Sequence, residues 1–351
     1  MMNRVAVSLH KVRLELTAGR DAGELFRFAH SYLAPLLDQG IAEPNVQSVL
    51  EWDTVLPPES RSNLEQLGRR IWAGPHRLQY AEIWQVPGLQ MDVSWQDEVL
   101  AVRAAYAWPT RRAKWFTRVV ALARERLFAS LMYYLAYFPS VWWLEREQGW
   151  TLFHASAVAT SEGALVFSGL PGCGKSTTAL AALSMPGWRI VSDNLLFTDG
   201  NQVFSCPEPV HVDARTHALV GDLDDLVHPM GRRFSHQRQD YEIAPNARQP
   251  SAAPLALGFL RIGQETALRP VDQAAAVRRL MANDCLAKEW VAYQESAAAM
   301  HQVWPSIGDQ ERRWRNLAAL VQSIPCYDVT IARNAPVQQA IKYVAQAMLD
   351  G

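Results

Sequence analysis

Residues 164–183 read ALVFSGLPGCGKSTTALAAL and decide the fold of the second half of this 351-residue chain. The opening run, ALVFS, is short and apolar, which predicts a buried strand. The closing run, TTALAAL from Thr177 to Leu183, is rich in helix formers and predicts a helix. Between them, Gly169-Leu-Pro-Gly-Cys-Gly-Lys175-Ser176 fits G-x-x-x-x-G-K-[ST] at every fixed position. A loop of this kind between a strand and a helix predicts a phosphate-binding loop.

The chemistry of phosphate binding explains these residue types. Glycines let successive backbone N–H groups converge on phosphate oxygens at a helix N-terminus. Lys175 is expected to bridge the β- and γ-phosphates of ATP, and the Ser176 hydroxyl to ligate Mg²⁺. The predicted nucleotide-binding residues of the loop are Gly169, Pro171, Gly172, Cys173, Gly174, Lys175, Ser176 and Thr177. Cys173 fills a free position of the motif and is interpreted as a small filler rather than a redox switch.

The composition limits the functions open to the chain. Of its 34 lysines and arginines only five are lysines, so Lys175 is interpreted as selected for its compact ammonium group. The net charge of −1 gives no global field that favours nucleic acid or an anionic membrane. Four scattered cysteines without a Cys-x-x-Cys pair suit a reducing cytoplasm, and no signal peptide is predicted.

A carboxylate follows the next predicted strand. Trp188 to Ser192 (WRIVS) is apolar enough for a strand, and Asp193 comes directly after it, 18 residues beyond Lys175. At the end of that strand Asp193 can face the γ-phosphate. There it can hold Mg²⁺ or accept a proton from an attacking hydroxyl, and a turn residue is the plainer alternative.

These motifs together resemble the HPr kinase family, and most of all the HPr-kinase-related proteins associated with peptide modification. The resemblance lies in FHASAV (153–158), the loop GLPGCGKST and RIVSD (189–193), in that order. It implies a P-loop kinase core related to phosphoenolpyruvate carboxykinase and ATP-dependent phosphorylation of a serine hydroxyl. It also implies that Asp193 takes the substrate proton and that His154 lies close to it. A satisfied core histidine is the alternative for His154.

The chain departs from the family at two places. Asn194 stands where HPr-specific members have a second aspartate, and their signature Glu-Ile-Arg-Gly-Leu-Gly is absent. Glu208 or Asp213 can replace the missing metal ligand, although solvated loop acids are the simpler interpretation. These departures weaken HPr itself as the substrate.

Arginines in the loop-rich stretch 207–254 are candidates for stabilising the transferred phosphoryl group. They are Arg232, Arg233 and Arg238, and ordinary surface arginines are the alternative.

The N-terminal half is less informative. Residues 110–138 predict a helix that is basic at first (Arg111, Arg112, Lys114, Arg118) and apolar later. Cations mixed with Trp108 and Trp115 also occur in nucleic-acid binders, but a solvated helix face is the simpler interpretation. Leu127–Leu144 carries no charge over 18 residues, and Pro139 favours a buried helix that stops there over a membrane span.

We therefore predict an α/β fold with a P-loop kinase core of the HPr kinase type at 149–351 and a smaller α+β domain at 1–148. The expected function is an ATP- and Mg²⁺-dependent kinase acting on a serine of a peptide or protein. A nucleotide-dependent recognition module without phosphotransfer and a small-molecule hydroxyl kinase stay open, as does a homo-oligomer.

Overall fold

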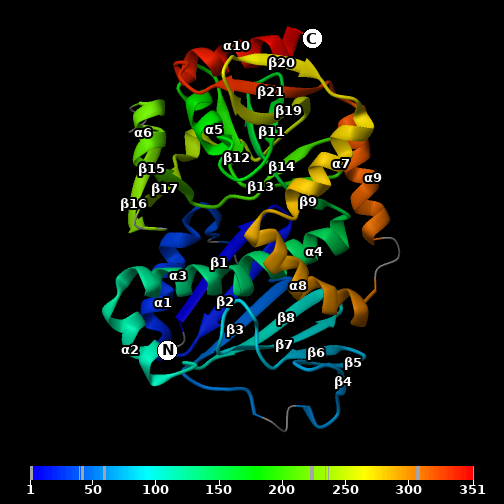
Figure 1. Ribbon diagram of the computed structural model, residues 1–351. Helices are drawn as coiled ribbons and strands as arrows, with labels where there is room; N and C mark the ends of the chain where they lie inside the picture. Colours follow the sequence, from blue (N-terminus) through cyan, green and yellow to red (C-terminus); the bar gives the residue numbers. More distant parts are fainter. Residues whose placement is uncertain are drawn as a thin grey trace. The chain divides into compact units, whose positions relative to one another are not determined.

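The computed structural model describes residues 3–38, 40, 43–57, 61–221, 225–233, 235, 237–305 and 309–350 of a mixed α/β protein. The chain divides into two compact units (Figure 1). The first comprises Met1–Gln148 and Ala292–Ile307, and the second Gly149–Val291 and Gly308–Gly351. Residues 292–307, which we expected in the C-terminal domain, therefore group with the first unit.

The first unit is built on an eight-stranded sheet in the order β1-β2-β3-β8-β7-β6-β5-β4. Strand β3 runs parallel to both of its neighbours, and the other pairs are antiparallel. In β2 the apolar residues alternate with polar ones, so Val12, Leu14 and Leu16 all point into the core. The strands are β1 (Asn3–Leu9), β2 (Val12–Ala18), β3 (Val46–Trp52), β4 (Glu65–Gly68), β5 (Ile71–Gly74), β6 (Arg77–Tyr80), β7 (Leu89–Gln96) and β8 (Val99–Tyr106).

Helices in this unit differ from the single helix expected over 110–138. The chain forms α1 (Gly23–Tyr32), α2 (Arg111–Val119), α3 (Ala121–Met132), a π-helical turn η4 (Tyr133–Tyr137) and α4 (Phe138–Gln148). The helix does not stop at Pro139, because the π-helical turn before it shifts the hydrogen-bond pattern where the proline lacks an N–H. Ser140 Oγ donates to the Ala136 carbonyl at 2.7 Å.

The run Ala121–Gln148 is long and apolar enough to cross a membrane by length and composition alone. However, 78% of its most apolar window is buried inside the protein. This burial is that of a core helix, as the sequence suggested.

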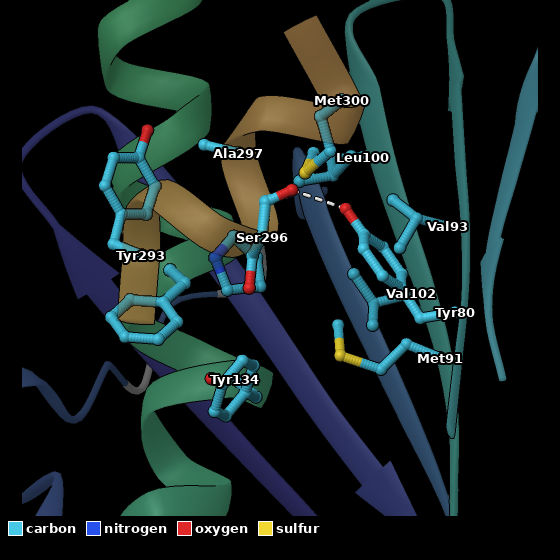
Figure 2. Close-up of a pocket in the computed structure, with 12 residues that line it drawn as sticks. Tyr80, Met91, Val93, Leu100, Val102, Tyr134, Tyr293, Ser296, Ala297 and Met300 are labelled. Atoms are coloured by element: carbon cyan, nitrogen blue, oxygen red, sulfur yellow. Dashed lines mark hydrogen bonds between the residues drawn. The ribbon is translucent and has the colours of Figure 1, made fainter. Parts of the chain in front are cut away.

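A late segment of the chain completes the first unit. The residues of α8 (Lys288–Val303) from Ala292 onward close a small cavity of about 20 Å³ over the sheet (Figure 2). The Tyr80 hydroxyl donates to the Ser296 carbonyl, and the Tyr293 hydroxyl to Glu145 Oε2. Trp304 Nε1 donates to the Pro75 carbonyl at 3.1 Å. These contacts tie residues far apart in sequence into one core.

The second unit has a six-stranded sheet in the order β12-β10-β11-β19-β21-β20. Strands β11, β19 and β21 are parallel neighbours, while β10 is antiparallel to both β11 and β12. Hence β12 and β11 run in the same direction. The strands are β10 (Ser156–Ala159), β11 (Ala164–Ser168), β12 (Arg189–Ser192), β19 (Pro254–Gly263), β20 (Ala267–Pro270) and β21 (Cys326–Ala332).

Two smaller sheets accompany it. One has the order β18-β14-β13-β9, with β9 (Thr151–His154), β13 (Leu195–Thr198), β14 (Val203–Ser205) and β18 (Ser251–Ala252). The other has the order β15-β17-β16, with β15 (Val210–Asp213), β16 (Val227–Arg233) and β17 (Arg238–Ile243). Much of the stretch that we expected to be loop-rich is therefore regular structure.

Helices cover both faces of the six-stranded sheet. On one face, α5 (Lys175–Leu183) and α10 (Val337–Asp350) pack on Leu165 and Phe167. On the other, α7 (Gln273–Asp284) and α9 (Asp309–Gln322) pack on Val166. Because both faces of β11 are covered, all five of its residues are buried, which explains the unbroken apolar run from Ala164 to Phe167. A short helix, α6 (Ala214–Val220), follows β15.

Candidate functional site

The predicted site residues gather at one edge of the six-stranded sheet. The 169–176 loop follows the carboxyl end of β11, and Asp193 follows the carboxyl end of β12, which runs the same way. His154 ends β9 two residues before the start of β10, and Ser156 of β10 pairs with Phe167 near the end of β11. The strand directions therefore bring all three to the same edge.

The loop backbone needs glycine at its two ends. Gly174 has φ 102° and forms the N-cap of α5, a conformation that side chains disfavour. A Cβ on Gly169 would lie 2.8 Å from both Cys173 Sγ and the Leu260 carbonyl oxygen. Gly174 is therefore favoured by its left-handed backbone, and Gly169 by the close approach of Cys173 and β19.

Lys175 is buried and folded onto its own loop. Its Nζ donates to the Gly169 carbonyl at 2.9 Å and to the Leu170 carbonyl at 3.5 Å. Burial lowers the pKa of the Lys175 ammonium, while the negative charge of Asp193 acts in the opposite direction. The lysine is held at the mouth of the loop, where an anionic ligand can replace these two carbonyls.

Asp193 is half-buried, yet its Oδ1 atom is fully enclosed and has no hydrogen-bond partner among the described residues. Burial raises the pKa of this carboxyl. A hydrogen bond to the Ser176 hydroxyl and the positive charges of His211, Lys175 and Arg238 oppose that rise. An enclosed, unpartnered carboxylate oxygen is a strong acceptor for a cation or a proton, so the donor set of Ser176 and Asp193 fits a bound Mg²⁺.

A cavity of about 470 Å³ opens beside these groups. It is lined by the loop from Pro171 to Thr178 and by His154, Asp193 and Asn194. Side chains of β15, α6 and β17, among them His211 and Arg238, also line it. Such a volume is in the range of small-molecule sites, and this one holds the predicted loop and the predicted carboxylate together.

His154 is buried and kept neutral. Its Nδ1 lies 3.3 Å from the Asn283 carbonyl oxygen, and its backbone N–H donates to Asp284 Oδ1 at 2.6 Å. Burial, reinforced by the charge of Lys175, lowers the pKa of the imidazole to about 4. The neutral ring already has a hydrogen-bond partner in the Asn283 carbonyl. His154 therefore suits the role of a positioning group better than that of a base.

The lowered pKa of His154 predicts that the protein loses stability in acid and that His154→Gln removes this loss. Since the folded-state pKa is about 4 and the unfolded value is 6.5, the stability is fully present above pH 6.5 and is lost as the pH falls towards 4. The loss amounts to about 3 kcal/mol at most. Urea unfolding at several pH values should show a shallower acid dependence for His154→Gln, and an unchanged one for the exposed His217→Gln. Equal slopes in all three proteins contradict the assignment.

A buried ion pair fixes the segment beneath His154. Asp284 Oδ2 accepts from Arg313 Nη2, and their side chains are 2% and 12% exposed. Arg313 Nη1 also donates to the Leu152 carbonyl at 2.6 Å, and its guanidinium lies 3.9 Å from the Trp290 ring centroid. Sequence reasoning missed this pair because no motif links residues so far apart.

A second pair missed in the sequence is His211 with Asp240. These residues lie opposite each other in the β15–β17 ladder, with His211 Nδ1 2.9 Å from Asp240 Oδ1. The only sequence signal for this pair was the alternation of apolar and polar residues in β15 and β17. A proline-containing segment separates these two short strands. His211 and Arg238 face the same cavity as Asp193.

The remaining candidates have other surroundings. Glu208 Oε2 accepts from Asn194 Nδ2 at 3.1 Å, and Asp213 caps α6 by accepting from the Thr216 N–H at 2.7 Å. That hydrogen bond lowers the pKa of Asp213. The part of the chain that the structure describes has no group of three or more His, Cys, Asp or Glu side chains placed to hold a metal ion. A metal here would therefore depend on substrate oxygens and water as well.

Arg232 and Arg233 lie in β16, but their side chains fall outside what the structure describes. Of the three predicted arginines, Arg238 is the one seen to line the cavity.

Comparison with known proteins adds little. No known family model matches the chain, and no curated protein matches its sequence. Among solved structures it is similar to the HPr(Ser) kinase/phosphatase from Coxiella burnetii, at 9% sequence identity and a TM-score of 0.28. The match covers 57% of this chain and 99% of that one. A TM-score this low does not establish a shared fold, so the family resemblance stays an expectation.

Proposed function

We propose that this protein is an ATP- and Mg²⁺-dependent kinase that transfers the γ-phosphoryl group to a serine hydroxyl of a peptide or protein. One observation carries the proposal. The glycine-rich loop with its buried Lys175 and the enclosed Oδ1 of Asp193 meet at one cavity, and this oxygen has no hydrogen-bond partner in the part of the chain that the structure describes. Phosphate cradle and carboxylate are the two parts that phosphoryl transfer requires.

In this proposal the loop amides and Lys175 hold the phosphates, and Ser176 and Asp193 hold Mg²⁺. The bound ion supplies charge neutralisation of the phosphate oxygens. Asp193 accepts the proton of the serine hydroxyl as the new O–P bond forms. The bond between the γ-phosphorus and the bridging oxygen breaks, and ADP leaves. Because burial raises the pKa of Asp193, its carboxylate is a better proton acceptor than that of an exposed aspartate.

The other groups around the cavity support this chemistry. Arg238, with Arg232 and Arg233 as further candidates, supplies positive charge for the transferred phosphoryl group. His154 stays neutral, and its contact with the Asn283 carbonyl helps to position the edge of the six-stranded sheet where the loop and Asp193 lie. The resemblance of the sequence to HPr-kinase-related proteins supports a serine acceptor, and the scattered cysteines support a cytoplasmic setting.

The proposal is tested with γ-labelled ATP, Mg²⁺ and serine-containing peptides. Label on serine is the expected result, and label on a small hydroxyl metabolite instead points to the small-molecule kinase. Tight nucleotide binding without any transfer supports the recognition module, which is consistent with Asn194 in place of a second carboxylate.

Lys175→Ala is expected to weaken ATP binding by about 10- to 100-fold, because it removes charge-assisted hydrogen bonds to the phosphates. Lys175→Arg is the matched control that retains the charge and alters its shape. We expect it to recover part of the affinity but little of the transfer, since a guanidinium cannot occupy the place of a compact ammonium. Equilibrium binding of a fluorescent ATP analogue measures both. Unchanged affinity in Lys175→Ala contradicts the proposed role of the loop.

A further inference from the structure

Helix α2 (Arg111–Val119) exposes apolar side chains that the described residues of its own unit leave uncovered. Trp115 is 63%, Phe116 49% and Val119 61% exposed, and no residue of the helix is buried. Large apolar side chains gathered on one exposed element mark an interaction surface.

The three apolar residues share one face of the helix. At 100° per residue, Trp115, Val119 and Phe116 occupy neighbouring positions around the axis. Arg112 projects between Val119 and Phe116, and Arg111 and Arg118 border Trp115 on the other side. All three arginines are exposed, and no acidic residue occurs from residue 110 to 123. The face is thus both apolar and strongly cationic.

The opposite side of the helix is anchored. Lys114 Nζ donates to Asp53 Oδ2, and the Thr110 side chain caps the helix by accepting from the Ala113 N–H at 3.0 Å. Just before the helix, Trp108 packs edge-on against Trp52 and Tyr106. Trp108 therefore serves the fold, whereas Trp115 does not. Anchoring fixes which face of the helix points outward, so little order has to be gained on binding.

We propose that α2 binds the surface of an anionic lipid bilayer, with Trp115, Phe116 and Val119 in the headgroup region and the arginines against lipid phosphates. Aromatic rings beside cations on one convex face are the pattern of helices that lie in a membrane interface. A purely acidic polymer would be matched by the arginines alone and would leave the apolar residues uncovered. Because the net charge of the chain is only −1, attraction to an anionic surface has to come from a local cationic patch such as this one.

Co-sedimentation of the full chain with vesicles tests this proposal. We expect binding to phosphatidylcholine vesicles that contain phosphatidylglycerol, and much weaker binding to phosphatidylcholine alone or at high salt. Arg111→Gln and Arg118→Gln should each reduce the partition coefficient by roughly fivefold. The double variant with Trp115→Ser and Phe116→Ser should reduce it by at least about tenfold.

Trp84→Ser is the matched control, because Trp84 is 73% exposed in the same unit and lies outside α2. It should bind vesicles like the unaltered chain, and circular dichroism should show that every variant is folded. Equal binding by the Trp84 and Trp115/Phe116 variants overturns the proposal, as does equal binding to neutral and anionic vesicles. Binding to RNA or polyglutamate with no binding to anionic vesicles overturns it as well. Phosphorylation of a soluble peptide should be the same in all these variants, so a failure here is distinct from a failure of the kinase proposal.

Discussion

Asp193→Asn is expected to lower the rate of phosphoryl transfer by about 10²- to 10⁴-fold while ATP still binds. The carboxylate is the proposed acceptor of the hydroxyl proton and one of the two proposed ligands of Mg²⁺. An amide of the same shape cannot take that proton and offers the ion no negative charge. The loop amides and Lys175, which hold the nucleotide in this proposal, are untouched. Single-turnover transfer of labelled phosphate and binding of a fluorescent ATP analogue, measured side by side, check both halves.

The same substitution should stabilise the fold at neutral pH. Burial raises the folded-state pKa of Asp193, so its unfavourable ionisation is felt as the pH rises above the unfolded value. The amide side chain of the Asp193→Asn variant carries no charge to bury. We therefore expect a higher melting temperature at pH 7 and a smaller difference at low pH. An inactive but more stable variant rules out misfolding as the cause of the lost activity.

Asp199→Asn is a suitable control, because Asp199 is an exposed turn residue whose Oδ1 accepts from two backbone N–H groups of its own loop. It should change neither transfer nor melting temperature appreciably. Transfer at a near-normal rate by Asp193→Asn would sink the assignment of the base.

Asp284→Ala is expected to destabilise the second unit by about 3–5 kcal/mol. The change leaves the Arg313 guanidinium buried without its counter-charge, and it removes the acceptor of the His154 backbone N–H. Chemical unfolding followed by a probe in the second unit measures the loss.

Two further variants separate the loss of the buried ion pair from the loss of stability that removal of any paired aspartate would cause. Asp284→Leu combined with Arg313→Met removes both charges and should recover much of the stability, because neither partner is then left unpaired. Asp328→Ala breaks two more exposed pairs, with Arg279 at 2.8 Å and with Arg261 at 3.5 Å, and each should cost less than about 1 kcal/mol. Equal losses for Asp284→Ala and Asp328→Ala contradict the importance of the buried pair.

The features that could be predicted from the sequence lie in one continuous segment of the chain. Strand β11, the loop and α5 follow one another without interruption, and each has its own periodicity and glycine chemistry, so they could be predicted together with the edge where Asp193 lies. His211 and Asp240 could not be predicted, because their meeting depends on the register of strands separated by α6 and β16. The same holds for Asp284 and Arg313, whose pairing follows from how α7 and α9 pack.

The continuation of the helix past Pro139 shows another limit. A proline is a reliable stop only where the helix before it keeps its regular hydrogen bonds, and the π-helical turn at Tyr133–Tyr137 removes that condition. The aromatic side chains of this turn pack inside the first unit, and Tyr137 is among its largest fully buried residues. Tertiary packing thus overrides a strong local signal.

The place of residues 292–304 in the first unit has a consequence for biosynthesis. When residues 1–148 have emerged from the ribosome, the eight-stranded sheet still lacks Tyr293, Ser296 and Met300. These residues form one wall of its internal cavity (Figure 2). The nascent chain therefore presents an apolar surface until translation has passed Trp304, after almost all of the second unit's sheets have emerged. The N-terminal unit is therefore begun first and finished late, so its complete core has to wait for chain elongation through Trp304.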